Sequence, residues 1–253
     1  MSIAQSVLIA VAGIVCGTVN SIAGGGSLIL FPALLATGLP PLSANVTNSV
    51  SAWPGYAGGL VGFRPELIGQ GSRMRPLIVA ALLGSATGCA LLLLTPSSAF
   101  DLVVPLLILV AAALLAFQPH IKKLVGEPVE GNRVWTVQIP AMLAATVYGG
   151  YFGAALGVIV LGVLAITVPD TLRRLNALKG VVSFVSGSVS VAVFAVFGPV
   201  NWQYALIAAP MALIGGYLGA RIARHVNETA LRWSVVVLGV AIAGYLFVKG
   251  LTS

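Results

Sequence analysis

Charged side chains are scarce in this chain of 253 residues: aspartate, glutamate, lysine and arginine make up 8% of it, and hydrophobic residues make up 58%. A water-soluble domain covers its surface with charged residues, so this composition excludes that class of protein. Several stretches approach or exceed the ~20 apolar residues that cross ~30 Å of hydrocarbon. The sequence therefore predicts an integral membrane protein whose surroundings are the lipid bilayer.

Cysteine and histidine are almost absent, and no acidic residue lies deep in an apolar run. The two cysteines, Cys16 and Cys89, lack the spacing of a metal or redox site. Without Asp, Glu or His at depth, neither an intramembrane proton relay nor an intramembrane protease is visible. No nucleotide-binding motif is present either. We therefore expect a protein that is not an enzyme and that carries no cofactor or metal.

Apolar runs divide the chain into short and long segments that we expect to be helical, because a lipid-spanning segment must satisfy its own backbone hydrogen bonds. The runs are continuous, unlike the short alternating segments of a membrane β-barrel. They fall at about 6–23, 27–38, 43–62, 76–95, 101–118, 136–152, 154–168, 177–197, 203–222 and 231–249.

The segments on the two sides of a polar interval at 119–135 match one another in order, which indicates an internal duplication. The matched pairs are Pro41 with Pro169, Asn48 with Asn176, Gly25 with Gly153, Gly84 with Gly215 and Gly88 with Gly219. We therefore predict a first transmembrane repeat at 1–118, a cytoplasmic linker at 119–135 and a second transmembrane repeat at 136–253.

The net charge of +7 is distributed in a way that predicts topology rather than nucleic-acid binding. Basic residues gather in cytoplasmic connections. The turn at 39–42 is uncharged while its equivalent at 169–175 is basic, and 63–75 is basic while its equivalent at 198–202 is uncharged. The two repeats are therefore expected to be inverted, in a multi-pass protein of the plasma (inner) membrane with both termini outside.

An inverted repeat needs an odd number of crossings in each half. The runs at 27–38 and 154–168 are too short to span comfortably. Each half is thus predicted to be a helical hairpin with a glycine-rich tip, followed by three transmembrane helices. The tips fall at AGGGS (residues 23–27) and YGGYFGA (residues 148–154). The predicted fold class is an all-α integral membrane protein with two inverted-topology repeats.

A glycine tip at membrane depth is typical of the binding sites of secondary transporters, where broken helices meet at the repeat interface. The first backbone N–H groups after the tip carry the positive end of a helix dipole and favour an anion. Ser27 can cap that helix or donate its hydroxyl group. The alternative is that the glycines serve tight helix packing, as we expect for Gly13, Gly17, Gly55, Gly59, Gly84, Gly88, Gly215 and Gly219.

Polar residues in apolar segments complete the candidate site, because lipid disfavours them and they should face the interior. Lys179 is either the fixed positive charge of an anion site or a side chain that extends to the cytoplasmic surface. The predicted substrate-binding residues are Asn20, Ser21, Gly24, Gly25, Gly26, Ser27, Thr47, Asn48, Ser51, Tyr148, Gly149, Gly150, Asn176, Lys179 and Ser183.

Residues 20–52 resemble the first-repeat signature of the sulfite exporter TauE/SafE family, and residues 172–226, which include GGYLGARIAR, resemble its second repeat. The resemblance implies a secondary transporter that exports small sulfur-containing anions such as sulfite, sulfonates or thiosulfate. Many members carry a lysine near position 51, where this chain has Ser51, so the positive charge of the site falls to Lys179. An anion channel and a non-transporting membrane scaffold stay open as alternatives. Formation of a homo-oligomer stays open for each of these functions.

Overall fold

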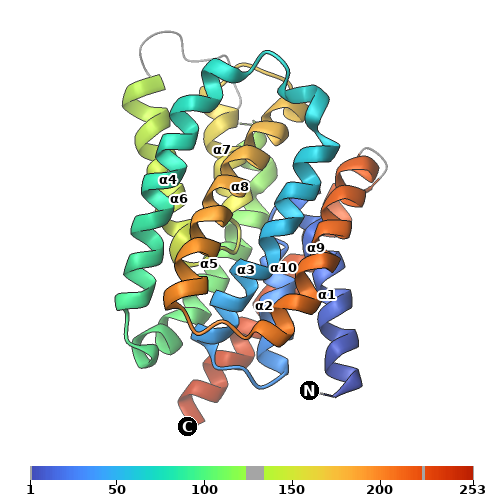
Figure 1. Cartoon of the computed structure of the whole chain (residues 1–253), viewed down its shortest axis with the longest axis vertical. Helices are drawn as coiled ribbons and strands as arrows, with labels where there is room; N and C mark the ends of the chain where they lie inside the picture. Colours follow the sequence, from blue (N-terminus) through green and yellow to red (C-terminus); the bar gives the residue numbers. More distant parts are fainter. Residues whose placement is uncertain (1, 124–133, 224–225, 253) are drawn as a thin grey trace.

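The structure is a computed structural model that describes residues 2–123, 134–223 and 226–252, and every regular element in those ranges is a helix (Figure 1). The elements are α1 (Ile3–Ile22), α2 (Ser27–Ala36), α3 (Pro41–Gly62), η1 (Arg64–Leu67), α4 (Gly71–Leu94), α5 (Ser97–Lys123), η2 (Val134–Gln138), α6 (Ile139–Tyr151), α7 (Leu156–Thr167), α8 (Leu172–Phe197), α9 (Trp202–Ile222) and α10 (Glu228–Thr252). The predicted all-α class is confirmed. The linker predicted at 119–135 begins inside α5, and its residues 124–133 lie outside the described part of the chain.

Six of the described helices are long and apolar enough to cross a membrane: α1, α4, α5, α8, α9 and α10. Helix α3 has 22 residues but is too polar for that group. Its Asn45, Thr47, Asn48 and Ser51 are at most 1% exposed, so protein rather than lipid surrounds them. At 1.5 Å per residue α3 is about 33 Å long, which is enough to cross the bilayer as an interior helix.

Two helical hairpins, α1–α2 and α6–α7, each precede three long helices. Figure 1 shows the first hairpin starting at the end of the bundle that holds both chain termini, and the second starting at the opposite end. Helix packing repeats in exchanged form: α1 and α3 pack on α9, while α6 and α8 pack on α4. This arrangement is compatible with the predicted inverted repeat.

Glycine and other small residues let the long helices approach closely at their crossings. A Cβ on Gly17 would collide with the backbone of Ala212 and Gly216 in α9, and one on Gly216 would collide with Gly55 of α3. The second half has the matching contact, where Gly84 of α4 faces the α6 backbone. The packing role predicted for Gly17, Gly55 and Gly84 is confirmed.

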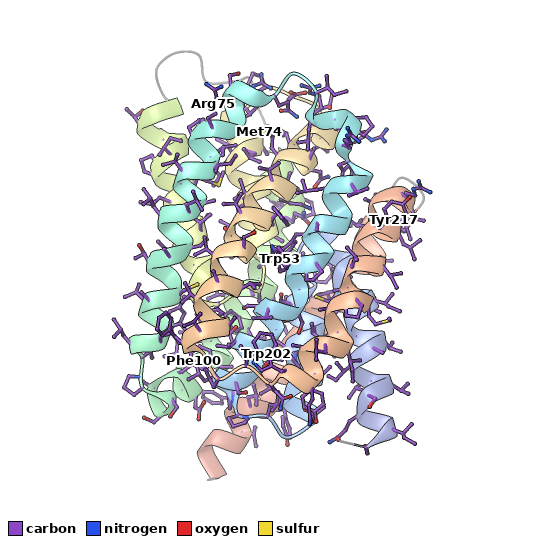
Figure 2. The ribbon with its side chains drawn as sticks, in the orientation of Figure 1. Trp53, Met74, Arg75, Phe100, Trp202 and Tyr217 are labelled. Carbon is purple, nitrogen blue, oxygen red and sulfur yellow. The ribbon has the colours of Figure 1, made fainter. Side chains whose placement is uncertain are left out.

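Arginines of the connections at 63–75 and 169–175 lie together at one end of the bundle. The connection that carries Arg75 lies at the end opposite to Phe100 and Trp202, which mark two uncharged connections (Figure 2). The end with Arg75 is the end of the bundle to which the positive-inside rule applies. We call it the basic end below.

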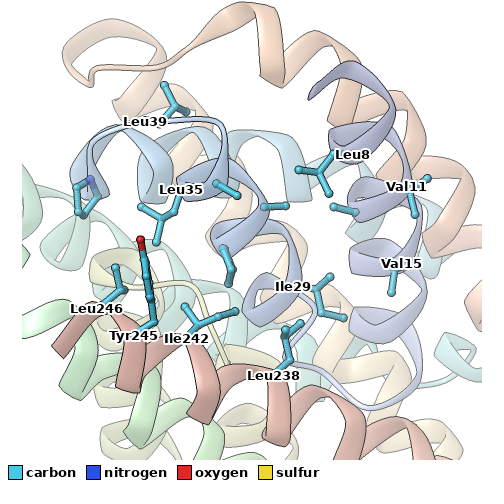
Figure 3. A pocket seen from close by; sticks show the side chains of 16 residues that line it. Leu8, Val11, Val15, Ile29, Leu35, Leu39, Leu238, Ile242, Tyr245 and Leu246 are labelled. Atoms are coloured by element: carbon cyan, nitrogen blue, oxygen red, sulfur yellow. The ribbon is translucent and has the colours of Figure 1, made fainter. Parts of the chain in front are cut away.

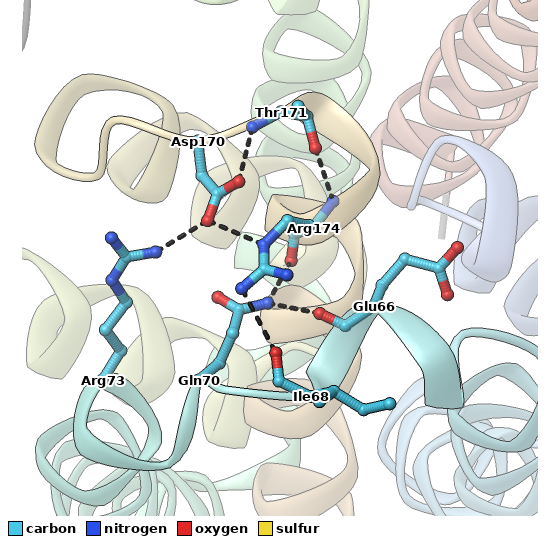
Figure 4. A network of polar contacts seen from close by, with 7 residues as sticks. All are labelled: Glu66, Ile68, Gln70, Arg73, Asp170, Thr171 and Arg174. Carbon is cyan, nitrogen blue, oxygen red and sulfur yellow. Dashed lines mark hydrogen bonds and ion pairs between the residues drawn. The ribbon is translucent and has the colours of Figure 1, made fainter.

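A network of polar contacts joins the two halves at the basic end (Figure 4). The Asp170 carboxylate accepts hydrogen bonds from Arg73 at 2.7 Å, from Arg174 at 2.9 Å and from the Thr171 N–H at 2.8 Å. Burial by itself raises the pKa of Asp170, but the Thr171, Arg174 and Arg73 hydrogen bonds favour the charged form and bring the pKa below its ordinary value of 3.8.

The lowered pKa makes this contact sensitive to acid. The Asp170 carboxylate stabilises the fold fully above its ordinary pKa of 3.8, and the contribution disappears as the pH falls through the lower pKa of the folded state. We expect Asp170→Asn to lower stability at pH 7 by about 1 kcal/mol or less, because solvent screens the partly exposed arginines.

Thermal unfolding of the detergent-purified protein at pH 7, 5 and 3 measures this effect. The difference between wild type and Asp170→Asn should persist at pH 5 and shrink at pH 3. Asp101→Asn, an exposed position at the opposite end, is the matched control. A difference that is the same at all three pH values would contradict the assignment.

Candidate functional site

The first hairpin tip is a glycine turn inside the protein. Gly24 and Gly25 have φ angles of 83° and 89°, which L side chains rarely adopt, so the sequence needs glycine there. Gly26 occupies the N-cap position of α2, and its N–H donates to the side-chain oxygen of Asn20 at 2.8 Å. Ser27 is therefore the first helical residue rather than the cap. Among the described residues, the Ser27 N–H finds no backbone acceptor.

The second tip lies a few residues later than the sequence suggested. Helix α6 continues to Tyr151, so Gly149 and Gly150 belong to its last turn, and the tip comprises residues 152–155. Ala155, with a φ of 62°, starts α7 in the left-handed conformation that glycine provides in the first tip. Gly150 packs on the backbone of Ser85 in α4.

The first tip touches the second hairpin through backbone atoms. A Cβ on Gly24 would lie 3.0 Å from the Val158 nitrogen and 3.1 Å from the Gly157 carbonyl carbon, both in the first turn of α7. Contact at this distance leaves no room for a side chain. The hairpins of the two halves therefore meet in the interior, as their glycine content predicted.

A small polar cavity, which we call the tip cavity, lies where the hairpins meet. Its volume is about 20 Å³, and the first residues of both short helices, Ser27 and Leu156, line it. Asn48 and Ser186 are 1% and 2% exposed and also line it. Within the described residues, neither side chain makes a hydrogen bond. The remaining lining residues are Ser49, Tyr56, Gly149, Gly153, Gly187 and Ser190.

A second cavity of about 20 Å³, the lysine cavity, shares the lining residue Tyr56 with the tip cavity. Lys179 is 3% exposed there, and its ammonium group donates to the carbonyl oxygens of Asn20 at 3.2 Å and Ser21 at 3.4 Å. These carbonyls end α1, where the helix dipole favours a cation. The alternative that Lys179 extends to the cytoplasmic surface is wrong. The cavity lining is Asn20, Ser21, Tyr56, Gly59, Phe63, Asn176, Lys179, Gly180 and Ser183.

Lys179 also reaches the second hairpin. A Cβ on Gly157 would lie 3.5 Å from the Lys179 Cδ and 3.3 Å from the Gly24 Cα. The lysine stem therefore packs beside the point where the tips meet, while its charge caps α1. One side chain of α8 thus holds parts of both hairpins.

A third cavity, the basic vestibule, leads from the basic end toward the lysine cavity. Its volume is about 590 Å³. Arg173 of α8 and Arg221 of α9 contribute positive charge to its walls. Arg173 forms an ion pair with Glu66 at 2.9 Å, and the Arg221 guanidinium lies over the Tyr217 ring. Positive walls raise the local concentration of anions.

Several of the predicted site residues form hydrogen bonds that hold helices together, and some of them do not line either cavity. The Ser21 hydroxyl, although at the lysine cavity, donates to the Gly216 carbonyl at 2.8 Å. Thr47 accepts from the Asn201 N–H at 2.9 Å, and Ser51 donates to the Thr47 carbonyl at 2.6 Å. The predicted residues outside both cavities are Gly24, Gly25, Gly26, Thr47, Ser51, Tyr148 and Gly150.

Sequence reasoning omitted several residues that line the cavities, chiefly Tyr56, Ser186 and Ser190. The serines were detectable, because Ser183, Ser186 and Ser190 continue one face of α8 at helical spacing. Tyr56 carried no such signal. An aromatic residue in an apolar run is ordinary, and only its neighbours reveal its position.

A larger groove of about 710 Å³ lies between α1, α2 and α10, away from the tips (Figure 3). Aliphatic side chains such as Leu8, Ile29 and Leu238 form its walls, with the Tyr245 hydroxyl as a polar exception. A dry apolar wall does not compensate an anion for its lost hydration. Volume alone is therefore a poor guide to the site in this protein.

Comparisons with known proteins agree with this architecture. The chain is 27% identical over 228 residues to a "Probable membrane transporter protein" of Haemophilus influenzae, which covers 89% of this chain and 88% of that protein. It is 25% identical over 236 residues to "Probable membrane transporter protein ORF9" of Sinorhizobium sp, a match that covers 92% of this chain and 88% of that protein. It is 23% identical over 232 residues to "Probable membrane transporter protein YfcA" of Escherichia coli K12, which covers 91% of this chain and 85% of that protein.

No solved structure matches the chain. The family comparison is more informative, since residues 9–246 match the family described as sulfite exporter TauE/SafE. That match runs from within α1 to within α10 and covers both hairpin tips. The chain is a multi-pass membrane protein and belongs to the sulfite exporter TauE/SafE family of membrane transporters.

Proposed function

We propose that this protein is a secondary transporter that exports small sulfur-containing anions of the sulfite, sulfonate or thiosulfate type across the plasma membrane. The observation that carries the proposal is the tip cavity, where two short helices begin. In the described residues, Ser27 N–H, Leu156 N–H and Gly157 N–H have no backbone acceptor. Such N–H groups and the positive ends of their helix dipoles stabilise an anion without a charged side chain.

Side chains in the tip cavity add hydrogen-bond donors to the two helix ends. The buried Ser186 hydroxyl makes no hydrogen bond inside the described protein, so it can donate to a ligand oxygen. The orphaned atom of Asn48 is its acceptor Oδ1, and the donor that Asn48 offers to a ligand oxygen is its Nδ2 group. Sulfur oxyanions present several acceptor oxygens around one centre. Lys179 supplies the nearby positive charge from the adjacent cavity.

Export has a physical driving force in this scheme. With a negative cytosol, each negative charge that leaves gains ~2.3 kcal/mol per 100 mV of membrane potential. Alternating access would move one repeat against the other around the two tips. The cytoplasmic end would be the basic end, with both chain termini outside. A small anionic substrate is the partner that this proposal requires.

Uptake of radiolabelled anions into proteoliposomes tests the proposal, with sulfite, thiosulfate, sulfoacetate, taurine, sulfate and small carboxylates as the panel. We expect saturable counterflow of at least one sulfur oxyanion. Turnover at channel rates without saturation would favour an anion channel. The absence of flux for every anion would favour a scaffold.

A mutation in the tip cavity should weaken binding of the transported anion. Asn48→Ala removes one hydrogen bond to a charged ligand, which contributes about 1.5–3 kcal/mol, so we expect a ~10- to 100-fold higher Kd. Thermal-shift titration measures it. Ser43→Ala, on the same helix but bonded to the Pro199 carbonyl at the uncharged end, is the control and should bind normally. Equal Kd values for Asn48→Ala and wild type would contradict the tip cavity as the site.

A further inference from the structure

The basic vestibule, the lysine cavity and the tip cavity form a series along α3 and α8. Phe63 and Asn176 line both the basic vestibule and the lysine cavity. Tyr56 lines both the lysine cavity and the tip cavity. Tyr56 and Phe63 are seven residues apart on α3, which places them on one face. On α8 the lining residues extend from Asn176 to Ser190, about 21 Å along the helix.

The series is open at one end and closed at the other. At the basic end the vestibule holds about 590 Å³. Beyond the tip cavity, the Asn45 side-chain amide donates to the Tyr151 carbonyl at 3.0 Å, and Thr47 accepts from the Asn201 N–H at 2.9 Å. These bonds tie α3 to the end of α6 and to the uncharged connection before α9. The structure is therefore a state that opens toward the basic end.

Neither inner cavity can hold a substrate at its present size. A volume of about 20 Å³ has room for about one water molecule. A sulfur atom with three oxygens needs several times that volume. The binding space must form by movement of the cavity walls, and Tyr56 is the residue that lines both cavities.

The Tyr56 ring is held by fewer directed contacts than its neighbour Trp53. Trp53 is held by stacking on Phe184 and by a hydrogen bond from its indole N–H to the Ser188 hydroxyl at 2.9 Å. Tyr56 instead lies against Gly187, where an added Cβ would be 3.3 Å from its Cδ2. Pro54 precedes it by two residues and removes one hydrogen bond from the middle of α3, so the helix can bend there.

We infer that Tyr56 is the inner gate of this protein: its ring separates the tip cavity from the lysine cavity, and its displacement joins them into one substrate-sized space reached from the basic end. The inference rests on the proposed transport function for its effect on flux. The separation of the two cavities by the Tyr56 side chain can be measured without a known substrate.

Cysteine labelling tests the partition directly. In a background with Cys16→Ala and Cys89→Ala, Ser183→Cys reports on the lysine cavity and Ser186→Cys reports on the tip cavity. The probe is the silver ion, which is about the size of a water molecule and reacts with thiols, applied to right-side-out and inside-out membrane vesicles. Ala223→Cys, in the basic vestibule, identifies the vesicle orientation that exposes the vestibule.

From the vestibule side we expect Ser183→Cys to react at least tenfold faster than Ser186→Cys. Adding Tyr56→Ala should raise the rate of Ser186→Cys to that of Ser183→Cys, which itself should change little. Tyr56→Phe keeps the ring and should leave both rates as they were. If Tyr56→Ala does not yield folded protein, Tyr56→Leu provides the same comparison with a smaller loss of volume.

Two outcomes would overturn the gate. One is a Ser186→Cys rate that Tyr56→Ala and Tyr56→Leu leave unchanged. The other is an equal acceleration at both cysteines, which would indicate general loosening of the helices. The labelling result is independent of transport. A protein that moves none of the tested anions can still show the gate, and a transporter can fail to show it.

Discussion

Replacing Gly24 with alanine is expected to reduce transport at least tenfold, because it separates the two hairpin tips. A Cβ there would lie 3.0 Å from the Val158 nitrogen and 3.1 Å from the Gly157 carbonyl carbon. These are backbone atoms of α7, which cannot rotate away as a side chain can. Alanine at a φ of 83° also costs about 1–2 kcal/mol of backbone strain. Flux in proteoliposomes and the melting temperature measure the two effects separately.

A second glycine separates the strain from the contact. Gly38 has a φ of 93°, and nothing lies within 4 Å of the place where its Cβ would be. Gly38→Ala should therefore lower the melting temperature by a similar amount and leave transport near the wild-type rate. Gly25→Ala should transport at a rate between those of Gly24→Ala and Gly38→Ala, because its Cβ meets only the movable Leu115 side chain at 3.3 Å. Equal transport by Gly24→Ala and Gly38→Ala would show that the contact between the tips is irrelevant to function.

Replacing Lys179 with methionine should have the other large effect, a loss of transport of about 100-fold or more. Methionine nearly keeps the length of the stem but removes both the charge and the donor. The carbonyls of Asn20 and Ser21 then lose a buried partner, which costs about 1–3 kcal/mol of stability. The proposed anion site also loses the positive charge of Lys179.

Lys179→Arg distinguishes charge from packing, because it retains the positive charge and the donors. We expect it to recover a measurable part of both anion binding and thermal stability. Size-exclusion chromatography in detergent confirms that each variant is folded before flux is compared. A folded Lys179→Met protein with normal flux would reduce Lys179 to a structural cap of α1 and remove it from the anion site.

Much of the architecture followed from residue patterns that act locally. The apolar runs predicted the helices because each lipid-spanning segment must satisfy its own hydrogen bonds. The short runs and the three glycines predicted a buried hairpin, and the φ angles of Gly24 and Gly25 explain why glycine is required there. The position of the second tip was predicted less well, because Gly149 and Gly150 continue α6 rather than end it.

The sequence by itself determined the membrane class, the helices, the two hairpins and the end of the bundle that is basic, since these depend on composition and spacing within a segment. The tertiary structure decided which polar residues face a cavity. Lys179 bonds to carbonyls 159 and 158 residues away, and Ser21 to one 195 residues away. Such partners depend on how each helix is rotated against its neighbours. That rotation results from packing over the whole bundle, and so the place of Tyr56 between two cavities could be found only in three dimensions.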